Sequence, residues 1–397
     1  MHIRAVRATP VNIPFRAPFR HRRWPKGRGS SASYTKTVVE VQTDEGATGL
    51  GEAADGDTSA LIERLGALLV GLEPHELNEA ERRCLPPETY NQQSNLLALR
   101  RAFGAIEIAL WDLRGKIEGR PLYELLGGAV RREIPVTEYF SLRLARDGEG
   151  GESSNTDVAE YCARMREEHG STAFEGKVAV RSPEVEVDMV KEIRRAVGDD
   201  AVLRLDANGA WTVTTAREVL ARMAPYYVRS IEEPVMTFEE MARLRPTTSM
   251  SFSAHTPDLR RAVMLGVPDA IVLSLVEAGG VRRTVEFVQA CELMGVGFWF
   301  YSGDTGIASA GYLHLSAAIE AIREPHQSLS RWQADDVIEE GPLVAHNGVV
   351  TLPDGPGLGV TLDRRSLERC HQRFVDEGPF PSGEAPGAPS AGPYARF

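Results

Sequence analysis

The stretch LRLDANGAW at residues 203–211 and the tetrapeptide IEEP at residues 231–234 decide the predicted fold. In each, a short apolar run ends in a carboxylate, Asp206 in the first and Glu232 in the second, and a helical pattern follows. If both runs are parallel strands of one barrel, both carboxylates lie at the rim formed by the carboxyl ends of the strands, where barrel enzymes hold their active sites. Two hard oxygen ligands at one rim predict a site for a divalent cation.

The same alternation of strand-like and helical patterns runs on both sides of this stretch, from Ile134 onward. Such alternation predicts a parallel sheet with crossover helices. Eight repeats of the unit favour a closed barrel over an open sheet. The predicted strands are 134–144, 172–180, 201–207, 228–233, 250–255, 269–275, 297–303 and 327–332.

The two ends of the chain follow other patterns. Residues 1 to about 55 predict a β-meander, in which the run from Lys36 to Thr43 alternates apolar and polar side chains. From 57 to 126 the pattern is helical, and one apolar stripe is predicted to pack into the core. The stripe consists of Ile106, Ala109, Leu110, Leu113 and Ile117. The tail 376–397 is so rich in Pro, Gly, Ser and Ala that we expect it to be disordered.

Composition excludes several classes of function. The chain has 397 residues, 42% of them apolar, and a net charge of −11. An acidic chain is repelled by nucleic acid and by anionic membranes, so we expect neither as a partner. No signal-peptide pattern and no bilayer-spanning apolar run is present, which predicts a cytoplasmic protein. The cysteines form no CxxC pair, and we expect them to be reduced and buried; they are Cys84, Cys162, Cys291 and Cys370.

Four polar residues recur at the ends of successive predicted strands. Lys177, Asp206, Glu232 and His255 follow one another at intervals of 29, 26 and 23 residues. One strand–helix unit of a barrel has a similar length, since roughly 250 residues make eight units. The four side chains are therefore predicted to lie at one height on four neighbouring strands.

Side-chain alternation adds further polar groups to the inward faces of these strands. Glu175 shares a face with Lys177, and Arg204 and Asn208 share a face with Asp206. A structural network of salt bridges is the alternative interpretation. Buried ion pairs at that density are costly and rarely add stability, which favours a functional site.

Five motifs resemble the mandelate racemase and muconate lactonizing group of the enolase superfamily, and they follow one another in the same order as in that group. The resemblance covers nearly the whole chain except the tail. It implies an α+β capping domain at 1–130, a (β/α)7β modified TIM barrel at 131–345, and a return to the cap at 346–375. It also implies Mg²⁺ that stabilises an enediolate. The motifs are GLGEA at 49–53, AIEIALWDLRGKIEGRPLYELLGG at 105–128, DANGAW at 206–211, IEEP at 231–234 and DGPGLGV at 354–360.

The resemblance implies metal ligands at the ends of the third, fourth and fifth barrel strands. Asp206 and Glu232 match the first two, whereas Glu233 is expected to point to the other side of its strand. His255 stands where the group usually has Glu or Asp. The glucarate dehydratase-like branch places a neutral Asn there, so a neutral ligand is tolerable, although imidazole is softer than Mg²⁺ prefers. Asp258, a bridging water, or a histidine that binds no metal are the alternatives.

The resemblance also implies the base. Lys177 matches the second lysine of the Lys-x-Lys pair that removes the proton, and Glu175 replaces the first. A plain Glu175–Lys177 ion pair is the alternative. On the opposite face, Ser274 takes the place of a catalytic lysine on the sixth strand. The seventh strand lacks a histidine and offers Tyr301, Ser302 and Asp304 instead, of which Tyr301 and Asp304 are candidate proton donors.

The segment from Arg20 to Ser31 is basic, rich in Gly and without periodicity. It is either a solvated loop or a lid whose cations meet an anionic substrate. The residues expected to contact the substrate are Glu175, Asn208, Ser274, Ser302, Arg20, Arg22 and Trp24.

With one base visible, elimination is favoured over racemisation, and we expect a Mg²⁺-dependent acid-sugar dehydratase acting on a small carboxylate. A racemase or epimerase of a hydroxy or amino acid is one alternative. A metal-binding relative without turnover is another. The resemblance also implies a homo-oligomer, either a dimer or an octamer.

Overall fold

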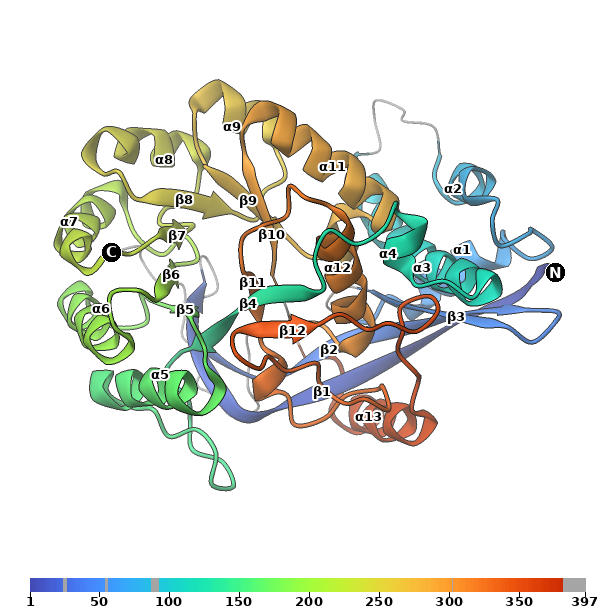
Figure 1. Ribbon diagram of the computed structural model, residues 1–397, viewed down its shortest axis with the longest axis horizontal. Coiled ribbons are helices and arrows are strands. Elements are labelled where there is room, and N and C mark those ends of the chain that lie inside the picture. Colours follow the sequence, from blue (N-terminus) through green and yellow to red (C-terminus); the bar gives the residue numbers. More distant parts are fainter. Residues whose placement is uncertain (24–26, 54–55, 87–92, 302, 381–397) are drawn as a thin grey trace.

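The computed structural model describes residues 1–23, 27–53, 56–86, 93–301 and 303–380 (Figure 1). The N-terminal sheet is antiparallel and has the order β1 (Ile3–Arg23), β2 (Gly27–Thr43) and β3 (Thr48–Ala53). It is the predicted β-meander. The turn Asp44-Glu45-Gly46 joins β2 to β3, and Gly46 has a φ of 91°, which suits glycine.

Four helices complete the N-terminal region. Two glycines of the GLGEA motif bring β3 against α3. A Cβ on Gly51 would lie 2.1 Å from the carbonyl oxygen of Ala105, and one on Gly49 would lie 2.0 Å from that of Ala109. The predicted stripe on α3 is buried except for Ile117, which is 45% exposed because it lies in the last turn of the helix. The helices are α1 (Ser59–Ala67), α2 (Leu77–Cys84), α3 (Gln93–Glu118) and α4 (Leu122–Leu125).

Eight parallel strands form a nearly closed barrel, as predicted. Each lies within or next to the range expected from the sequence, and most are shorter than expected. The sheet has the order β10-β9-β8-β7-β6-β5-β4-β11. The strands are β4 (Glu133–Phe140), β5 (Ala173–Lys177), β6 (Val202–Asp206), β7 (Ser230–Glu232), β8 (Ser251–Ala254), β9 (Ala270–Leu273), β10 (Gly297–Phe300) and β11 (His326–Ser328).

A buried histidine joins the two end strands of this sheet. The backbone N–H of Phe300 on β10 donates to Nδ1 of His326 on β11 at 3.1 Å. Nε2 of the same ring lies 2.7 Å from Oγ of Ser316. Burial lowers the pKa of His326 to about 3, so the ring is neutral and Nδ1 can accept a hydrogen bond.

Helices cover the outside of the barrel, where Figure 1 shows α5 to α9 and α11 arranged around the strands. They are α5 (Asn155–His169), α6 (Pro183–Val197), α7 (Val213–Met223), α8 (Phe238–Leu244), α9 (Leu259–Leu265), α10 (Leu275–Ala278), α11 (Val281–Met294) and α12 (Gly306–Ala318). Short 3₁₀ turns lie at Ala224–Tyr226, Arg245–Thr247 and Ser330–Trp332.

After the barrel the chain returns toward its beginning. β12 (Val349–Thr351) pairs antiparallel with β4, and α13 (Arg364–Glu377) packs on β1. On α13, Nη1 of Arg364 donates to Oε1 of Glu40 at 2.7 Å. Because α13 ends at Glu377, residues 376 and 377 are helical and do not belong to the expected tail. Residues 381–397 lie outside the described part.

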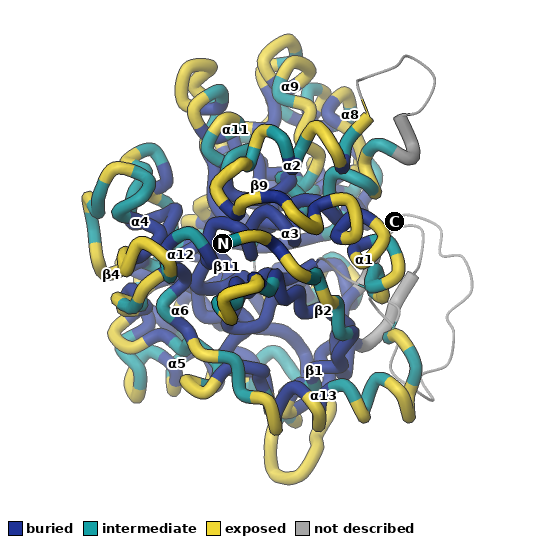
Figure 2. The backbone as a smooth tube through the Cα atoms, turned by 90° about the vertical axis from the view of Figure 1, so that its right-hand side faces the viewer, coloured by how far each residue is buried: buried dark blue, intermediate teal, exposed yellow. Residues whose placement is uncertain are grey.

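The buried residues form two large clusters. Figure 2 shows the strands buried, while exposed segments gather on the outer helices and loops. The smaller cluster lies between the N-terminal sheet and helices α1 and α3. The larger one fills the barrel region and joins it to the cap, where the ring of Phe19 lies 5.4 Å from that of Trp332 and 6.3 Å from that of Tyr139. The β1–β2 hairpin therefore packs on the barrel through aromatic contacts.

Two compositional expectations bear on this core. All four cysteines are buried free thiols. In the ranges that the structure describes, no helix combines the length and the apolar character needed to cross a membrane.

Candidate active site

A cavity of about 600 Å³ lies between the cap hairpin and the carboxyl ends of the barrel strands. Both parts of the chain contribute to its wall, as expected for a ligand site between a cap and a barrel. Cap residues on the wall include Phe15, Phe19, Ser31, Ser33, Tyr34, Lys36 and Arg101. Barrel residues on the wall include Tyr139, Lys177, Asp206, Asn208, Glu233, His255, Tyr301 and Gln327.

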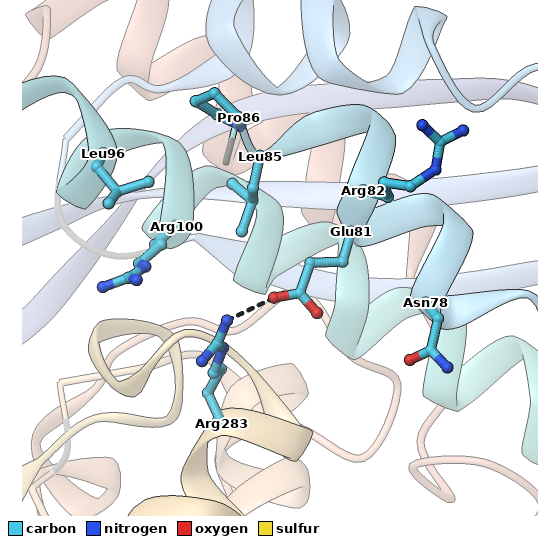
Figure 3. A pocket seen from close by; sticks show the side chains of 8 residues that line it. All are labelled: Asn78, Glu81, Arg82, Leu85, Pro86, Leu96, Arg100 and Arg283. Atoms are coloured by element: carbon cyan, nitrogen blue, oxygen red, sulfur yellow. Dashed lines mark hydrogen bonds and ion pairs between the residues drawn. The ribbon is translucent and has the colours of Figure 1, made fainter. Parts of the chain in front are cut away.

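A second cavity of similar volume lies away from these strand ends (Figure 3). Figure 3 shows its wall formed by α2, α3 and α11, with Glu81 turned toward Arg283. The two side chains form an ion pair at 2.6 Å. None of the predicted site residues lines this cavity, whereas several of them line the first one.

Three predicted site residues stand side by side on neighbouring strands. Lys177 on β5 is in register with Asp206 on β6, and Asp206 is in register with Glu232 on β7. The residues are 8%, 1% and 1% exposed. The predicted equal heights are therefore present for these three, and their side chains are nearly withdrawn from bulk water. The fourth residue is not at that height, because Glu232 is in register with Ser253, two residues before His255.

Asp206 is the most heavily bonded of the three. Its carboxylate forms an ion pair with the ammonium of Lys177. Asn208 donates twice to it, from the backbone N–H to Oδ1 at 2.8 Å and from Nδ2 to Oδ2 at 3.0 Å. Burial opposes the charged form, but Lys177 and His255 outweigh it and hold the pKa of Asp206 below its ordinary value. Asp206 is thus ionised and ready to bind a cation.

Glu232 has few partners. Among the described residues, neither of its oxygens accepts a hydrogen bond of good geometry. Nε2 of His255 lies 2.8 Å from Oε1, which is an ion contact without hydrogen-bond alignment. Burial, reinforced by the charge of Asp206 and only partly offset by His255, raises the pKa of Glu232 to about 8. A divalent cation would hold this buried carboxyl group in its ionised form, and its oxygens leave room for one.

His255 follows β8 and is oriented by the backbone. Its Nδ1 lies 3.0 Å from the carbonyl oxygen of Val272, so Nδ1 carries a hydrogen and Nε2 faces Glu232. Burial lowers the pKa of His255, but Glu232 reverses this effect and holds it well above the ordinary value. The ring packs edge-on against Tyr301 at 4.7 Å between centroids. A histidine whose other nitrogen is held by a carbonyl is the usual arrangement of a metal ligand.

These residues fit a divalent cation, although they are not arranged around one. In the described part of the chain, no three His, Cys, Asp or Glu side chains are already gathered as a coordination cluster. Instead, Lys177 pairs with Asp206, and His255 lies beside Glu232. It stays a prediction that Asp206, Glu232 and His255 bind the metal. The prediction is supported by the Glu232 oxygens, which accept no hydrogen bond of good geometry from the described residues, and by Nε2 of His255, which faces them.

The other two acids near the metal position behave differently from expectation. Asp258 caps α9, because its Oδ1 accepts the N–H of Arg261 at 3.0 Å. It is therefore occupied and a poor substitute ligand. Glu233 was expected to point away, yet it lines the cavity and accepts the backbone N–H of His255 at 3.2 Å. β7 ends at Glu232 and Glu233 has a φ of 42°, so strand alternation no longer applies.

Glu175 is placed elsewhere than expected. It does not line the cavity, and it does not pair with Lys177. Its carboxylate lies in the barrel interior, where it accepts hydrogen bonds from Thr137 at 3.3 Å and Gln327 at 3.2 Å. Arg204 Nη1 lies 3.7 Å from it. The alternative Glu175–Lys177 pair is wrong, because Arg204 and Asp206 take the two partners. The expected substrate contact stays a prediction that the cavity wall does not support.

The opposite side of the cavity also differs from expectation. Ser274 caps α10, with its Oγ accepting the N–H of Glu277 at 3.2 Å, and it does not line the cavity. Tyr301 does line it. Asp304 is 2% exposed and binds Nζ of Lys36 at 2.8 Å, so it reaches the cavity only through that lysine. Ser302 lies outside the described residues.

The segment expected to be a loop or a lid is strand in its described parts, residues 20–23 of β1 and 27–31 of β2, which pair with each other. Arg20 is exposed and absent from the cavity wall, while its backbone N–H is bonded to Leu142. The substrate contact expected of Arg20 therefore stays a prediction that the cavity wall does not support. Trp24 and the side chain of Arg22 lie outside the described residues.

Sequence reasoning missed the two cations that the cap places on the cavity wall, Lys36 and Arg101. Lys36 opens the alternating run of β2, but that strand is buried on both faces. The signal that could have identified Lys36 is its position in a strand whose side chains are buried on both faces.

Comparison with known proteins identifies the architecture. Residues 157–366 match the family described as enolase C-terminal domain-like, and residues 6–127 match the mandelate racemase and muconate lactonizing enzyme N-terminal domain. The chain belongs to the enolase superfamily. The barrel and its N-terminal sheet domain are thus the TIM-barrel fold of that superfamily.

Relatives of this enolase-superfamily enzyme catalyse different reactions. It is 29% identical over 381 residues to a probable glucarate dehydratase of Streptomyces coelicolor, covering 88% of each chain. It is 30% identical over 348 residues to a D-galactarolactone cycloisomerase of Agrobacterium fabrum, covering 83% of this chain and 89% of the relative. Lyases and isomerases both occur at this similarity, so the comparisons establish an enolase-superfamily enzyme and leave the reaction open.

A solved structure with bound magnesium is among the matches. An enolase from Pseudomonas fluorescens, crystallised with magnesium, potassium and tartrate, matches with a TM-score of 0.85 at 25% identity, covering 95% of this chain and 93% of that chain. An enolase from Mycobacterium smegmatis complexed with tartrate matches with a TM-score of 0.88 at 26% identity, covering 99% and 98%.

Proposed function

We propose that this enzyme is a Mg²⁺-dependent dehydratase of acid sugars, in which Lys177 removes the α-proton of a carboxylate substrate and water is then eliminated. The observation that carries the proposal is the contact of Lys177 with Asp206 on the wall of the cavity. It places an amine beside the predicted metal ligands.

The residues that would hold the cation are Asp206, Glu232 and His255. Bound there, Mg²⁺ supplies positive charge that offsets the negative charge developing on the substrate carboxylate as the α-proton leaves. Carboxylate oxygens suit Mg²⁺, and the related P. fluorescens structure contains magnesium. The imidazole of His255 is a softer donor than Mg²⁺ prefers, which makes Mn²⁺ a useful second metal to test.

Lys177 would act as the base once the cation neutralises Asp206. The ammonium is held by Asp206 in the structure described here, and a metal ion on that carboxylate competes for the same negative charge. A lysine released from its ion pair can lose a proton and accept one from the substrate. Asn208, which donates twice to Asp206, keeps the carboxylate oriented during this exchange.

The cavity suits a polyhydroxylated acid. Its wall combines hydroxyl and amide groups with aromatic rings of the cap hairpin. Polar groups at fixed positions recognise hydroxyls, and the rings exclude water from the reacting atoms. Relatives named as glucarate and D-xylonate dehydratases, at 29% and 28% identity, support this choice of substrate class.

An epimerase is the second candidate, and Tyr301 favours it. Tyr301 follows β10 and lines the cavity. Counted around the barrel through β11 and β4, β10 is three strands away from β5, which carries Lys177. A phenol there can return a proton to the face opposite Lys177. A relative named N-succinyl-L-Arg/Lys racemase, 24% identical over 387 residues, is consistent with that alternative.

One experiment separates the candidates. The full chain is freed of metal by chelation, reloaded with Mg²⁺, and incubated in D₂O with aldonic and aldaric acids. A dehydratase gives a 2-keto-3-deoxy acid, detected as its semicarbazone. An epimerase gives deuterium at Cα with inverted configuration and no keto acid, seen by NMR. If no acid in the library yields a keto acid, the proposed dehydratase is wrong, and if none exchanges its α-proton either, the epimerase is wrong as well.

A further inference from the structure

A buried ion pair joins the cap to the barrel at the cavity and has no part in the chemistry assigned to Lys177. Nζ of Lys36, on β2, lies 2.8 Å from Oδ1 of Asp304, between β10 and α12. The two side chains are 4% and 2% exposed. Removing both charges from water is costly, and such a pair is often less stabilising than an apolar one. Its place on the wall of the active-site cavity calls for a functional explanation.

The pair stands on the opposite flank of the metal position from Lys177. The strands β6, β7 and β8, which carry or precede the predicted metal ligands, are neighbours in the sheet. The strand of Lys177, β5, lies on one side of these three, and β10 lies on their other side, beyond β9. Asp304 follows β10, at the same carboxyl-end rim, and Lys36 is on the cavity wall together with Lys177. A substrate carboxylate held at β6 to β8 would thus have one lysine on each flank.

The surroundings fix Asp304 as the partner of Lys36. The backbone carbonyl of Asp304 accepts hydrogen bonds from Tyr34 Oη at 3.1 Å and Gln333 Nε2 at 2.7 Å. Glu52, the nearby acid of the GLGEA motif, is committed to the start of α12, where it accepts from Thr305 Oγ1 at 2.6 Å. Burial and the charge of Asp304 raise the pKa of Glu52 to about 8. The ammonium of Lys36 is therefore held by Asp304, on an element that does not carry a predicted metal ligand.

We propose that Lys36 is the general acid of the elimination, with Asp304 as its positioning residue. This inference rests on the proposed function. Lys177 takes the proton from Cα, and the electron pair of that C–H bond forms the double bond between Cα and Cβ. The Cβ–O bond breaks with its electron pair on oxygen, Nζ of Lys36 gives that oxygen a proton, and water leaves. The enol then becomes the keto acid, and solvent restores both lysines to their starting charges.

Chemistry requires such a donor. Hydroxide is a poor leaving group, so a β-hydroxyl departs readily only when it is protonated as the bond breaks. Glu175 and Ser274, which the sequence placed near the substrate, are turned to the barrel interior and to a helix cap. Lys36 combines an ionisable proton with a place on the cavity wall, as Tyr301 also does, and Asp304 holds the ammonium of Lys36 in position.

Lys36→Arg tests the inference most sharply. Arginine keeps the positive charge and the ion pair with Asp304, but it does not release its proton in proteins. The Mg²⁺-loaded variant is given, in D₂O, a substrate that the wild type dehydrates. We expect keto-acid formation to fall about 10²- to 10⁴-fold, the usual share of a general acid. Deuterium exchange at Cα, which depends on Lys177, should persist.

A fluorinated substrate provides the second readout. In the β-fluoro analogue the leaving group is fluoride, which needs no proton, so Lys36→Arg should eliminate fluoride at nearly the wild-type rate. Lys36→Met serves as a second variant, with its fold checked by circular dichroism and thermal unfolding. Arg101→Met is the matched control, because Arg101 is the other cap cation on the wall and pairs with Glu277. It should leave the ratio of exchange to elimination unchanged.

The outcomes are distinguishable. If Lys36→Arg forms keto acid at the wild-type rate, or if exchange and elimination fall together and the fluoro analogue is not rescued, Lys36 is a structural or binding residue and the inference is wrong. If the wild type forms no keto acid from any acid sugar, the proposed function fails, and the inference fails with it.

Discussion

Lys177 at the end of β5 and Asp206 at the end of β6 are cross-strand partners in register, and their side chains form a buried ion pair on the cavity wall. If Lys177 is the base and Asp206 a metal ligand, as we propose, their charges are linked, because a cation on Asp206 would weaken its hold on the ammonium. In the proposed function, the pair would connect metal binding to proton abstraction.

Replacing Lys177 with Ala should abolish exchange of the substrate α-proton. General bases typically contribute 10²- to 10⁴-fold, so we expect a loss of about that size in keto-acid formation. NMR in D₂O measures exchange, and the semicarbazone assay measures product. Lys191→Ala is the matched control, since Lys191 lies on α6 and not on the cavity wall. Exchange that survives in Lys177→Ala would show that another group is the base.

Divalent metal should stabilise the folded protein. At 100 times its dissociation constant, a ligand that binds only the native state adds about 2.7 kcal/mol to the free energy of unfolding. Thermal unfolding of the chelated protein with and without Mg²⁺ or Mn²⁺ measures this gain. Glu232→Gln should lose it, because an amide is a weaker ligand than a carboxylate. Equal stabilisation of wild type and variant would place the metal elsewhere.

His255 should set the preference between metals. Imidazole favours Mn²⁺ over Mg²⁺ more strongly than an oxygen ligand does. We expect His255→Asp to shift the ratio of the two dissociation constants toward Mg²⁺, measured by calorimetric titration of the metal-free protein. An unchanged ratio would mean that His255 stays a partner of Glu232 and does not bind metal.

His326 should make the barrel sensitive to acid. Its pKa of about 3 lies below the unfolded value of 6.5, so the native state binds fewer protons between these values. The stabilisation is present above pH 6.5 and is lost as the pH falls toward 3. Between pH 7 and pH 5 this amounts to about 2 kcal/mol of unfolding free energy.

Urea unfolding at the two pH values measures that loss, and His326→Gln should reduce it. Glutamine cannot titrate but can still accept the N–H of Phe300. Since burial also lowers the pKa of His314 to about 4, part of the slope should remain in the variant. A slope identical to that of the wild type would contradict the role given to His326.

Gly51→Ala should destabilise the cap. The added Cβ would lie 2.1 Å from the carbonyl oxygen of Ala105, and β3 would have to move away from α3. Overpacking of this kind costs about 1–3 kcal/mol. Gly297→Ala on β10 is the comparison, because its nearest neighbour is a side-chain carbon at 3.1 Å. Equal effects in urea unfolding would show that close packing of β3 on α3 is not what Gly51 provides.

Much of the fold follows from sequence because the barrel strands are short apolar runs at regular intervals. The same regularity predicts that Lys177, Asp206 and Glu232 come to one height, since parallel strands in register repeat their ends. Those predictions use only periodicity along the chain, which the sequence displays directly.

The rest depends on what happens after a strand ends or across domains. Glu233 turns into the cavity because its backbone leaves the strand with a positive φ, and Ser274 turns away because it caps a helix. Lys36 reaches the site from a sheet more than 250 residues before Asp304. The periodicity of the sequence predicts neither a local change of backbone conformation nor a contact between distant segments.

The most direct test of the site is anomalous diffraction from crystals of the full chain grown with Mn²⁺ and an acid-sugar ligand. We predict a Mn²⁺ peak within coordination distance of Asp206, Glu232 and Nε2 of His255, with Nζ of Lys177 directed at Cα of the ligand. A peak at any other position, or a Lys177 side chain turned away from the bound acid, would contradict the proposed site.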